Sequence, residues 1–227
     1  IQPVVTNAAG HLVALPMDVD ISGMVYNKAL LQELGIAVPE TWEQFLAACE
    51  TIKKAGDTPI AVAGKETSDV AGLMSRIALS LLVQSHAGYK AEFEQGSFDW
   101  SQFGVVTDFV ENLKAKGYLN ADYLTADKAT LYAEFARNKV VFAFQSNQTI
   151  AEIKKLNPAA DVSMMRLPVQ DTSTAPFLVS GERDSVGVWK DTKHPQEALT
   201  FIDYLAQPEN VRKIAEAYSL PAGLKGV

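Results

Sequence analysis

Four segments of this 227-residue chain carry carboxylate, amide, hydroxyl or guanidinium groups next to expected strand ends or helix starts. The candidate contact residues in them are Asp18, Asp20, Ser68, Asp69, Gln145, Asn147, Gln148 and Arg183, with Phe177 as the best-placed aromatic ring. Groups of these types form paired hydrogen bonds to vicinal hydroxyls, and an aromatic face packs against the C–H side of a sugar ring. Each well-made hydrogen bond contributes roughly 0.5–1.5 kcal/mol, so several must converge for micromolar binding.

The first two segments also have a structural interpretation. Asp18 and Asp20 follow an apolar run that ends at Pro16, and they are either solvated surface acids or ligand contacts. Ser68 and Asp69 open a predicted helix. They either cap that helix or contact a ligand, because the N–H groups at a helix start hold side-chain and ligand oxygens alike. The residues alone leave both alternatives open.

The same choice applies to the other two segments. Residues 145–148, with the sequence Gln-Ser-Asn-Gln, follow an all-apolar run and open a helix. Gln145 and Asn147 are predicted to contact a ligand through their amides, and the alternative is helix capping by Ser146 or Asn147. Arg183 either reaches a ligand or pairs with a neighbouring acid on the surface.

Catalytic and metal-binding motifs are absent from the sequence. The histidines lie far apart, and none has a second ligand three or four residues away. There is no nucleophile elbow, Walker loop or dinucleotide fingerprint. A glycosidase needs two carboxylates about 5–9.5 Å apart, usually from different elements, whereas Asp18 and Asp20 share one loop. We therefore expect no enzyme activity, no metal and no cofactor; a carbohydrate-active hydrolase that uses Asp18, Asp20 or Asp69 is the alternative.

The composition indicates a globular protein without affinity for polyanions. Hydrophobic residues make up 48% of the chain, charged residues make up 21%, and the net charge is -7. An acidic chain without a run of Lys and Arg is not expected to bind nucleic acid or an anionic membrane. No apolar stretch reaches the ~18 residues of a transmembrane helix. The single cysteine, Cys49, is expected to be a small buried apolar residue.

Strands and helices alternate along the predicted chain. The strands are expected near 12–15, 23–27, 59–63, 139–145, 161–166 and 184–189. The helices are expected over 28–34, 42–54, 69–85, 102–116, 128–137, 148–156, 195–206 and 208–218. This alternation predicts an α/β sandwich, in which helices pack over a central sheet. The candidate contact residues would lie where strands end, which is the usual ligand position in open α/β sheets.

Two of these elements are especially well defined. Thr41 is the expected N-cap of the helix over 42–54, and Gln44 completes a capping box. The apolar residues of this helix recur with helical spacing and include Trp42, which is therefore expected in the core. Residues 140–144 form a continuous apolar run, a pattern typical of a strand that is buried on both faces.

Several motifs follow one another in an order known from one protein family. Tyr-Asn-Lys at 26–28 is followed by Pro-x-Thr-Trp-Glu at 39–43, and the match continues at 135–142, 157–168, 193–198 and 220–222. In these motifs the chain resembles the extracellular solute-binding proteins of ABC importers, in the class of the maltodextrin binder. The resemblance implies an α/β, periplasmic-binding-protein-like fold of type II. It also implies that two lobes close around a captured solute, here a sugar or oligosaccharide.

Members of that family are longer, so the resemblance implies that this chain is mostly one lobe of a two-lobe fold. Residues 1–178 would form most of the second lobe, and residues 179–227 would form the lobe crossing and an incomplete part of the first lobe. Where the family has Gly-x-Trp, this chain has Ser146 and Gln148. Aromatic stacking on a ligand is therefore not expected at that point, and amide contacts are expected instead.

The expected partners and location follow from the same resemblance. The partners are a small-molecule solute, a carbohydrate, and the ABC permease subunits in the membrane. The location is extracytoplasmic, either in a periplasm or as a cell-surface lipoprotein. Residues 179–227 are also expected to expose apolar surface or to pair with another copy of the fragment. A surface adhesion module on the same fold is a further alternative.

Overall fold

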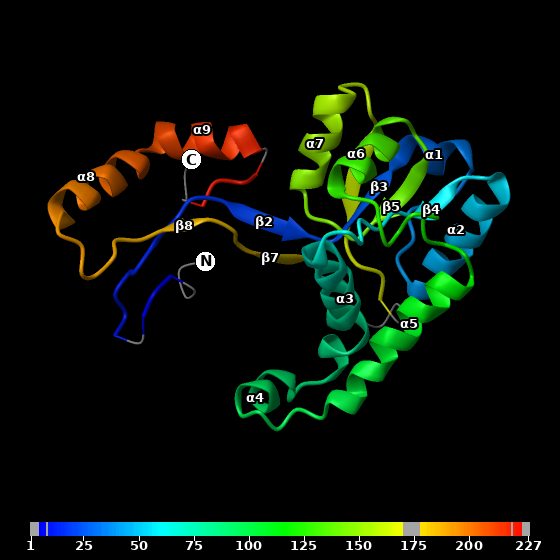
Figure 1. Cartoon of the computed structure of the whole chain (residues 1–227), viewed down its shortest axis with the longest axis horizontal. Helices are drawn as coiled ribbons and strands as arrows, with labels where there is room; N and C mark the ends of the chain where they lie inside the picture. Colours follow the sequence, from blue (N-terminus) through cyan, green and yellow to red (C-terminus); the bar gives the residue numbers. More distant parts are fainter. Residues whose placement is uncertain (1–4, 8, 170–177, 219, 224–227) are drawn as a thin grey trace. The chain divides into compact units, whose positions relative to one another are not determined.

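A computed structural model of the chain describes residues 5–7, 9–169, 178–218 and 220–223. The chain divides into two compact units (Figure 1). The larger unit is Ser22–Leu178, and the smaller unit combines Ile1–Ile21 with Val179–Val227.

The larger unit is built around a four-stranded mixed sheet with the strand order β4-β5-β3-β6. The strands are β3 (Met24–Asn27), β4 (Thr58–Ile60), β5 (Val140–Ala143) and β6 (Val162–Met165). Strand β4 is parallel to β5, and β3 is antiparallel to both β5 and β6. The carboxyl ends of β4, β5 and β6 therefore lie at one edge of the sheet together with the start of β3. We refer to this edge as the carboxyl edge.

Helices cover both faces of this sheet. The helices described in this unit are α1 (Lys28–Glu33), α2 (Trp42–Ala55), α3 (Thr67–Leu81), α4 (Tyr89–Glu94), α5 (Gly104–Ala115), α6 (Lys128–Ala136) and α7 (Gln148–Leu156), with single 3-10 turns η1 (Val83–Ser85) and η2 (Trp100–Phe103). Helix α4 lies away from the sheet (Figure 1). One core cluster joins the sheet to α1, α2, α3 and α5, and the other joins it to α6 and α7. Met24 and Tyr26 belong to the first cluster and Val25 to the second, because successive strand residues point to opposite faces.

The structure confirms the predicted helix start at Thr41. Its side chain accepts a hydrogen bond from the Gln44 backbone N–H at 3.2 Å, and the Gln44 side chain accepts one from the Thr41 N–H at 3.4 Å. Gly56 ends the helix in the left-handed conformation, with a φ of 93°. Trp42 and Cys49 are both buried as predicted, and burial raises the pKa of the Cys49 thiol.

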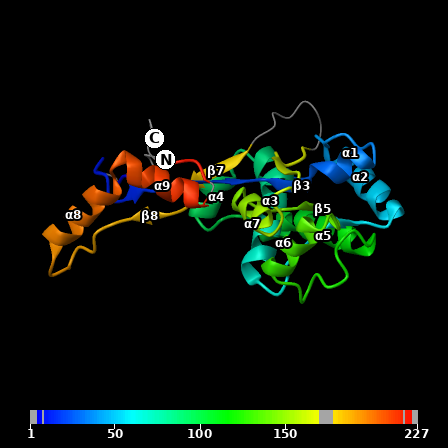
Figure 2. The same ribbon diagram turned by 90° about the horizontal axis from the view of Figure 1, so that it is seen from above.

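In its described residues, the smaller unit contains two short strand pairs and two helices. Strand β1 (Leu15–Pro16) pairs with β8 (Ser185–Val186), and β2 (Val19–Ser22) pairs with β7 (Val179–Glu182). The helices are α8 (Pro195–Leu205) and α9 (Pro208–Tyr218), the orange and red helices of Figure 2. Pro195 occupies the first turn of α8 as predicted, where a missing N–H costs nothing.

The two units differ from the predicted division of the chain at one end. The boundary after Leu178 coincides with the predicted one, but residues 1–21 group with the C-terminal segment and not with the larger unit. The reason is strand pairing, because β1 and β2 find their partners in β8 and β7. Which lobe each unit represents stays a prediction. Helix α4 and strands β2 and β7 were not predicted from the sequence.

Candidate functional site

Two of the predicted contact residues meet at the carboxyl edge. Asp69 lies in the first turn of α3, which follows β4, and Gln145 follows β5. The Gln145 side-chain amide donates a hydrogen bond to Asp69 Oδ1, and the Ala63 backbone N–H donates to Asp69 Oδ2 at 2.9 Å. Both side chains are buried. Parallel strands thus bring together residues that are 76 positions apart in the sequence.

Further hydrogen bonds tie Gln145 to its surroundings. Its backbone carbonyl accepts from the Gly23 N–H at 3.1 Å, at the start of β3. Its side-chain oxygen accepts from Thr149 Oγ1 at 3.4 Å, in the first turn of α7. The polar side chain is therefore held on both sides, which fixes the direction in which residues 146–148 leave the sheet.

Three other predicted residues lie at the same edge and are more exposed. Ser68 is exposed in the first turn of α3, whereas Asn147 and Gln148 are half-buried at the start of α7. Asn147 is the N-cap residue of α7, but its side chain makes no capping hydrogen bond, and the N-cap of α3 is Glu66, also without one. Neither N-cap residue therefore caps its helix through its side chain.

Sequence reasoning missed one residue at this edge, Arg76. Its Nη2 donates a hydrogen bond to Ser22 Oγ at 3.0 Å, and Ser22 forms a β-bridge with Ser146. A Cβ on Gly72 would lie 2.5 Å from Arg76 Nη1, so the guanidinium occupies the space that a side chain at position 72 would fill. The available sequence signal for this arrangement was the spacing of Gly72 four residues before Arg76, in the middle of a predicted helix.

In the smaller unit, Asp18 and Arg183 form a second polar cluster. Asp18 is 1% exposed, and its Oδ1 accepts a hydrogen bond from the Asp184 backbone N–H at 3.1 Å. Arg183 lies 3.9 Å from the Asp18 carboxylate and 2.9 Å from that of Asp184, with its guanidinium over the Tyr218 ring. Burial raises the pKa of Asp18, while the Asp184 N–H acts in the opposite direction.

The contacts of this cluster bear on the alternatives given above for Asp18 and Arg183. Asp18 is not a solvated surface acid, and Arg183 does pair with a neighbouring acid. A carboxylate that is 1% exposed offers a ligand almost no surface. Asp20 lies half-buried on β2, and Phe177 lies outside the described residues. Ligand contact by the predicted residues of either unit stays a prediction.

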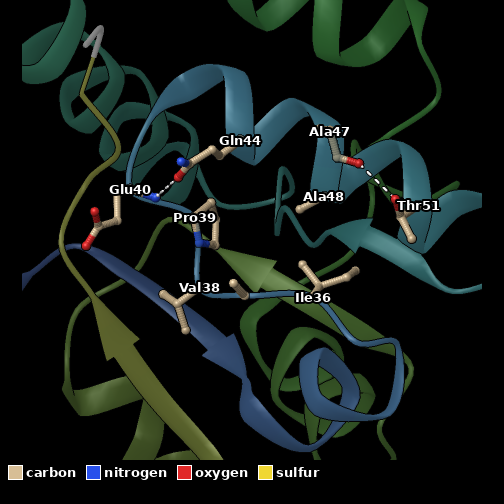
Figure 3. Close-up of a pocket in the computed structure, with 9 residues that line it drawn as sticks. Ile36, Val38, Pro39, Glu40, Gln44, Ala47, Ala48 and Thr51 are labelled. Atoms are coloured by element: carbon tan, nitrogen blue, oxygen red, sulfur yellow. Dashed lines mark hydrogen bonds between the residues drawn. The ribbon is translucent and has the colours of Figure 1, made fainter. Parts of the chain in front are cut away.

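A surface hollow of about 520 Å³ lies elsewhere in the larger unit, between α2 and the connection from α1 (Figure 3). None of the predicted contact residues lines it. The Gln44 side chain accepts from the Glu40 N–H at 2.8 Å, and Glu40 pairs with Arg166 at 3.0 Å. These polar groups thus hold the start of α2 in place.

The described part of the chain has neither a metal-binding cluster nor a membrane-spanning helix. No group of three or more His, Cys, Asp or Glu side chains there could hold a metal ion. In the same residues, every helix is too short or too polar to span a bilayer.

Comparison with known proteins decides the family. The sequence profile of the bacterial extracellular solute-binding proteins matches residues 2–212. The chain belongs to this family. The assignment confirms the predicted family. Members of this family are described as extracellular.

Two curated relatives carry sugar-binding names. The melibiose/raffinose/stachyose-binding protein of Bacillus subtilis strain 168 is 32% identical over 99% of this chain and 54% of its own length. The multiple sugar-binding protein of Streptococcus mutans is 28% identical over 94% of this chain and 52% of its own length. The chain thus spans about half the length of these relatives.

Solved structures confirm the predicted fold. A sugar transporter from Bacillus licheniformis in complex with stachyose superimposes with a TM-score of 0.88 at 32% identity, over 98% of this chain and 59% of that one. A binding protein from Bacillus subtilis in an open conformation gives 0.86 at 31% identity, over 99% and 58%. The fold is that of the solute-binding proteins, and the chain covers somewhat more than half of it.

Proposed function

We propose that this chain is the ligand-capturing part of an ABC importer's solute-binding protein, and that its ligand is an oligosaccharide of the raffinose and stachyose type. The observation that carries the proposal is the buried Asp69–Gln145 pair at the carboxyl edge, where Ser68 is exposed and Asn147 and Gln148 are half-buried, in a chain of this family. The names of the relatives and the stachyose complex of a structural neighbour support the choice of ligand.

The residues of the carboxyl edge have two different roles, positioning of the loops and contact with the ligand. Asp69 and Gln145 are buried and satisfy each other, so they position the two loops. Ser68, Asn147 and Gln148 have the exposure needed to reach a ligand. Hydroxyls and amides both donate and accept hydrogen bonds, which matches the alternating donors and acceptors of vicinal sugar hydroxyls. Because no aromatic ring replaces the family's Trp at Gln148, binding at this edge depends on hydrogen bonds.

In the whole protein, we propose that binding works by closure. A ligand that contacts both lobes binds the closed state more tightly than the open state, and it therefore shifts the population toward closure. Membrane permease subunits then recognise the closed form. No bond of the sugar is broken and no cofactor takes part. The location we propose is extracytoplasmic, in a periplasm or on a lipid anchor.

Ligand-observed NMR titration of the 227-residue chain tests this proposal. This method detects weak complexes, and weak binding is expected because the chain spans about half the length of its relatives. Stachyose and raffinose should receive saturation from the protein. Asn147→Ala with Gln148→Ala should raise the dissociation constant about thirtyfold, since the loss of two hydrogen bonds of average strength costs about 2 kcal/mol.

The matched control is Gln32→Ala. Gln32 is exposed on α1, which begins at the opposite edge of the sheet because β3 runs antiparallel to its neighbours. This variant should bind as the parent chain does. Absence of saturation transfer to any neutral sugar, or equal weakening by the control variant, would overturn the proposal.

A further inference from the structure

An aromatic cluster follows α3 in the larger unit. The rings of Tyr89 and Phe93 stack at 5.9 Å, and Phe98 meets both Tyr89 and Trp100 edge-on at 5.3 Å. Trp100 also contacts Phe93 at 6.1 Å and Phe103 at 6.2 Å. Figure 1 shows α4, which carries two of these rings, beyond the end of α3 and away from the sheet. We refer to residues 89–103 as the aromatic cluster.

Two rings of the aromatic cluster are unusually exposed. Phe98 is buried at its centre, but Phe93 is 52% exposed and Trp100 is 64% exposed. Single exposed apolar residues are ordinary, whereas several in contact mark an interaction site. The exposed rings of this cluster are therefore a candidate binding surface.

The exposed rings are also held in place. Asp99 caps the turn that carries Trp100, because its carboxylate accepts from the Ser101 N–H at 2.9 Å and from Ser101 Oγ at 2.8 Å. These hydrogen bonds lower the pKa of Asp99. His86 and Glu92 lie 2.9 Å apart at the start of α4. A rigid ring binds at a lower cost in conformational entropy than a mobile one.

The charges around the rings select the kind of partner. Glu92, Glu94 and Asp99 outnumber Lys90 on this segment, so phosphate-bearing partners and anionic lipids are repelled. A pyranose ring is neutral, and its C–H groups carry the small positive charge that the negative face of an aromatic ring attracts. Its hydroxyls donate hydrogen bonds to carboxylates, which act as acceptors.

We propose that the aromatic cluster is a second carbohydrate-binding surface, which takes pyranose rings of an oligosaccharide against Phe93 and Trp100. The choice of ligand rests on the proposed function. The surface is separate from the carboxyl edge, because the length of α3 from Asp69 in its first turn to Leu81 at its end lies between them. At about 1.5 Å per residue, that separation is roughly 20 Å.

Tryptophan accessibility provides a direct test. Of the three tryptophans, Trp42 is buried, so Trp189→Phe leaves Trp100 as the accessible one. Stachyose should protect Trp100 from acrylamide in a saturable manner and lower its quenching constant about twofold, because a bound sugar ring covers one of the two faces of the indole. In the same background, Phe93→Ala should reduce that protection, because it removes part of the surface.

A matched control is available in the same chain. Trp189 is 68% exposed and, among the described residues, has no ring contact. In a Trp100→Phe background, stachyose should leave the quenching of Trp189 unchanged. Equal protection of Trp189 and Trp100 would show a non-specific effect of the sugar and would overturn the proposal.

The remaining outcomes separate this proposal from the proposed function. If NMR shows stachyose binding but Trp100 stays fully quenchable, the aromatic cluster is not a sugar surface and the proposed function stands. If Trp100 is protected while Asn147→Ala with Gln148→Ala changes nothing, the carboxyl edge fails and the cluster stands. Protection by phosphatidylcholine vesicles, or protection that grows with protein concentration in the absence of sugar, would overturn the proposal in favour of a membrane or a second copy.

Discussion

Helices α2 and α8 have similar sequence patterns and different surroundings. Both carry an apolar stripe with helical spacing and begin with a recognisable start signal. In α2 the stripe is buried, and Phe45 is 0% exposed. In α8 no residue is buried, and Phe201 is 58% exposed. An amphipathic pattern therefore predicts that a helix forms, but it does not predict that the apolar face is covered.

The sheets of the two units explain this difference. The larger unit has a four-stranded sheet with helices on both faces, and its two core clusters contain no residue of the smaller unit. The smaller unit has two pairs of short strands. Two-stranded pairs are marginal in water and offer a helix little apolar surface. The apolar surface expected over residues 179–227 is thus present, on Trp189, Leu199, Phe201, Tyr204 and Tyr218.

A pair of phenylalanine substitutions tests the contrast most strongly. Phe45→Ala should lower the free energy of unfolding by about 3–5 kcal/mol, because it removes a fully buried ring from the core and leaves a cavity. Phe201→Ala should change it by less than about 0.5 kcal/mol, because the ring is exposed. Urea denaturation followed by far-UV circular dichroism measures both. A similar loss in the two variants would mean that the stripe of α8 is covered in solution.

The parts of the fold that were predictable are those set by local signals. The capping box at Thr41 and the apolar stripe after it depend on residues within a few positions, and both are found in the structure. The continuous apolar run at 140–144 indicates a doubly buried strand for the same reason. Helix α4 was missed because it has only six residues, which are too few to show a helical repeat of apolar positions.

The candidate site was harder to predict because its contacts are distant in sequence. The pairing of Gln145 with Asp69 spans 76 residues, and that of Asp184 with Asp18 spans 166. Strand ends could be recognised from the sequence, which is why Asp69 and Gln145 were selected. Whether a selected carboxylate is exposed or buried depends on what the rest of the chain places over it. Asp18 was selected but is buried, and Arg76 lies at the carboxyl edge but was not selected.

The helix starts offer a second and smaller contrast. Thr41→Ala should lower the free energy of unfolding by about 1 kcal/mol, because the Gln44 N–H loses the side-chain acceptor of the capping box. His194 precedes α8 and makes no side-chain capping hydrogen bond, so His194→Ala should have no measurable effect. Paired urea curves at pH 7 compare the variants. A loss of equal size at His194 would contradict the view that local capping distinguishes these two helices.

The smallest expected effect concerns Asp18, a buried acid of the smaller unit. Because burial raises the pKa of Asp18 above 3.8, ionisation of this carboxyl is less favourable in the folded chain than in the unfolded chain. The contribution of Asp18 to stability is therefore complete below pH 3.8 and declines as the pH rises through the raised pKa. Asp18→Asn, which cannot ionise, should gain stability relative to the parent chain over that window, and the difference should then level off.

Urea denaturation followed by far-UV circular dichroism measures this difference at a series of pH values. Asp203→Asn, at an exposed position on α8, is the matched control, and its difference from the parent chain should stay small across the series. A difference for Asp18→Asn that falls with rising pH would mean that pairing with Arg183 outweighs the cost of burial. Charge would then contribute to the stability of the smaller unit at Asp18, and the contrast with the larger unit would become sharper.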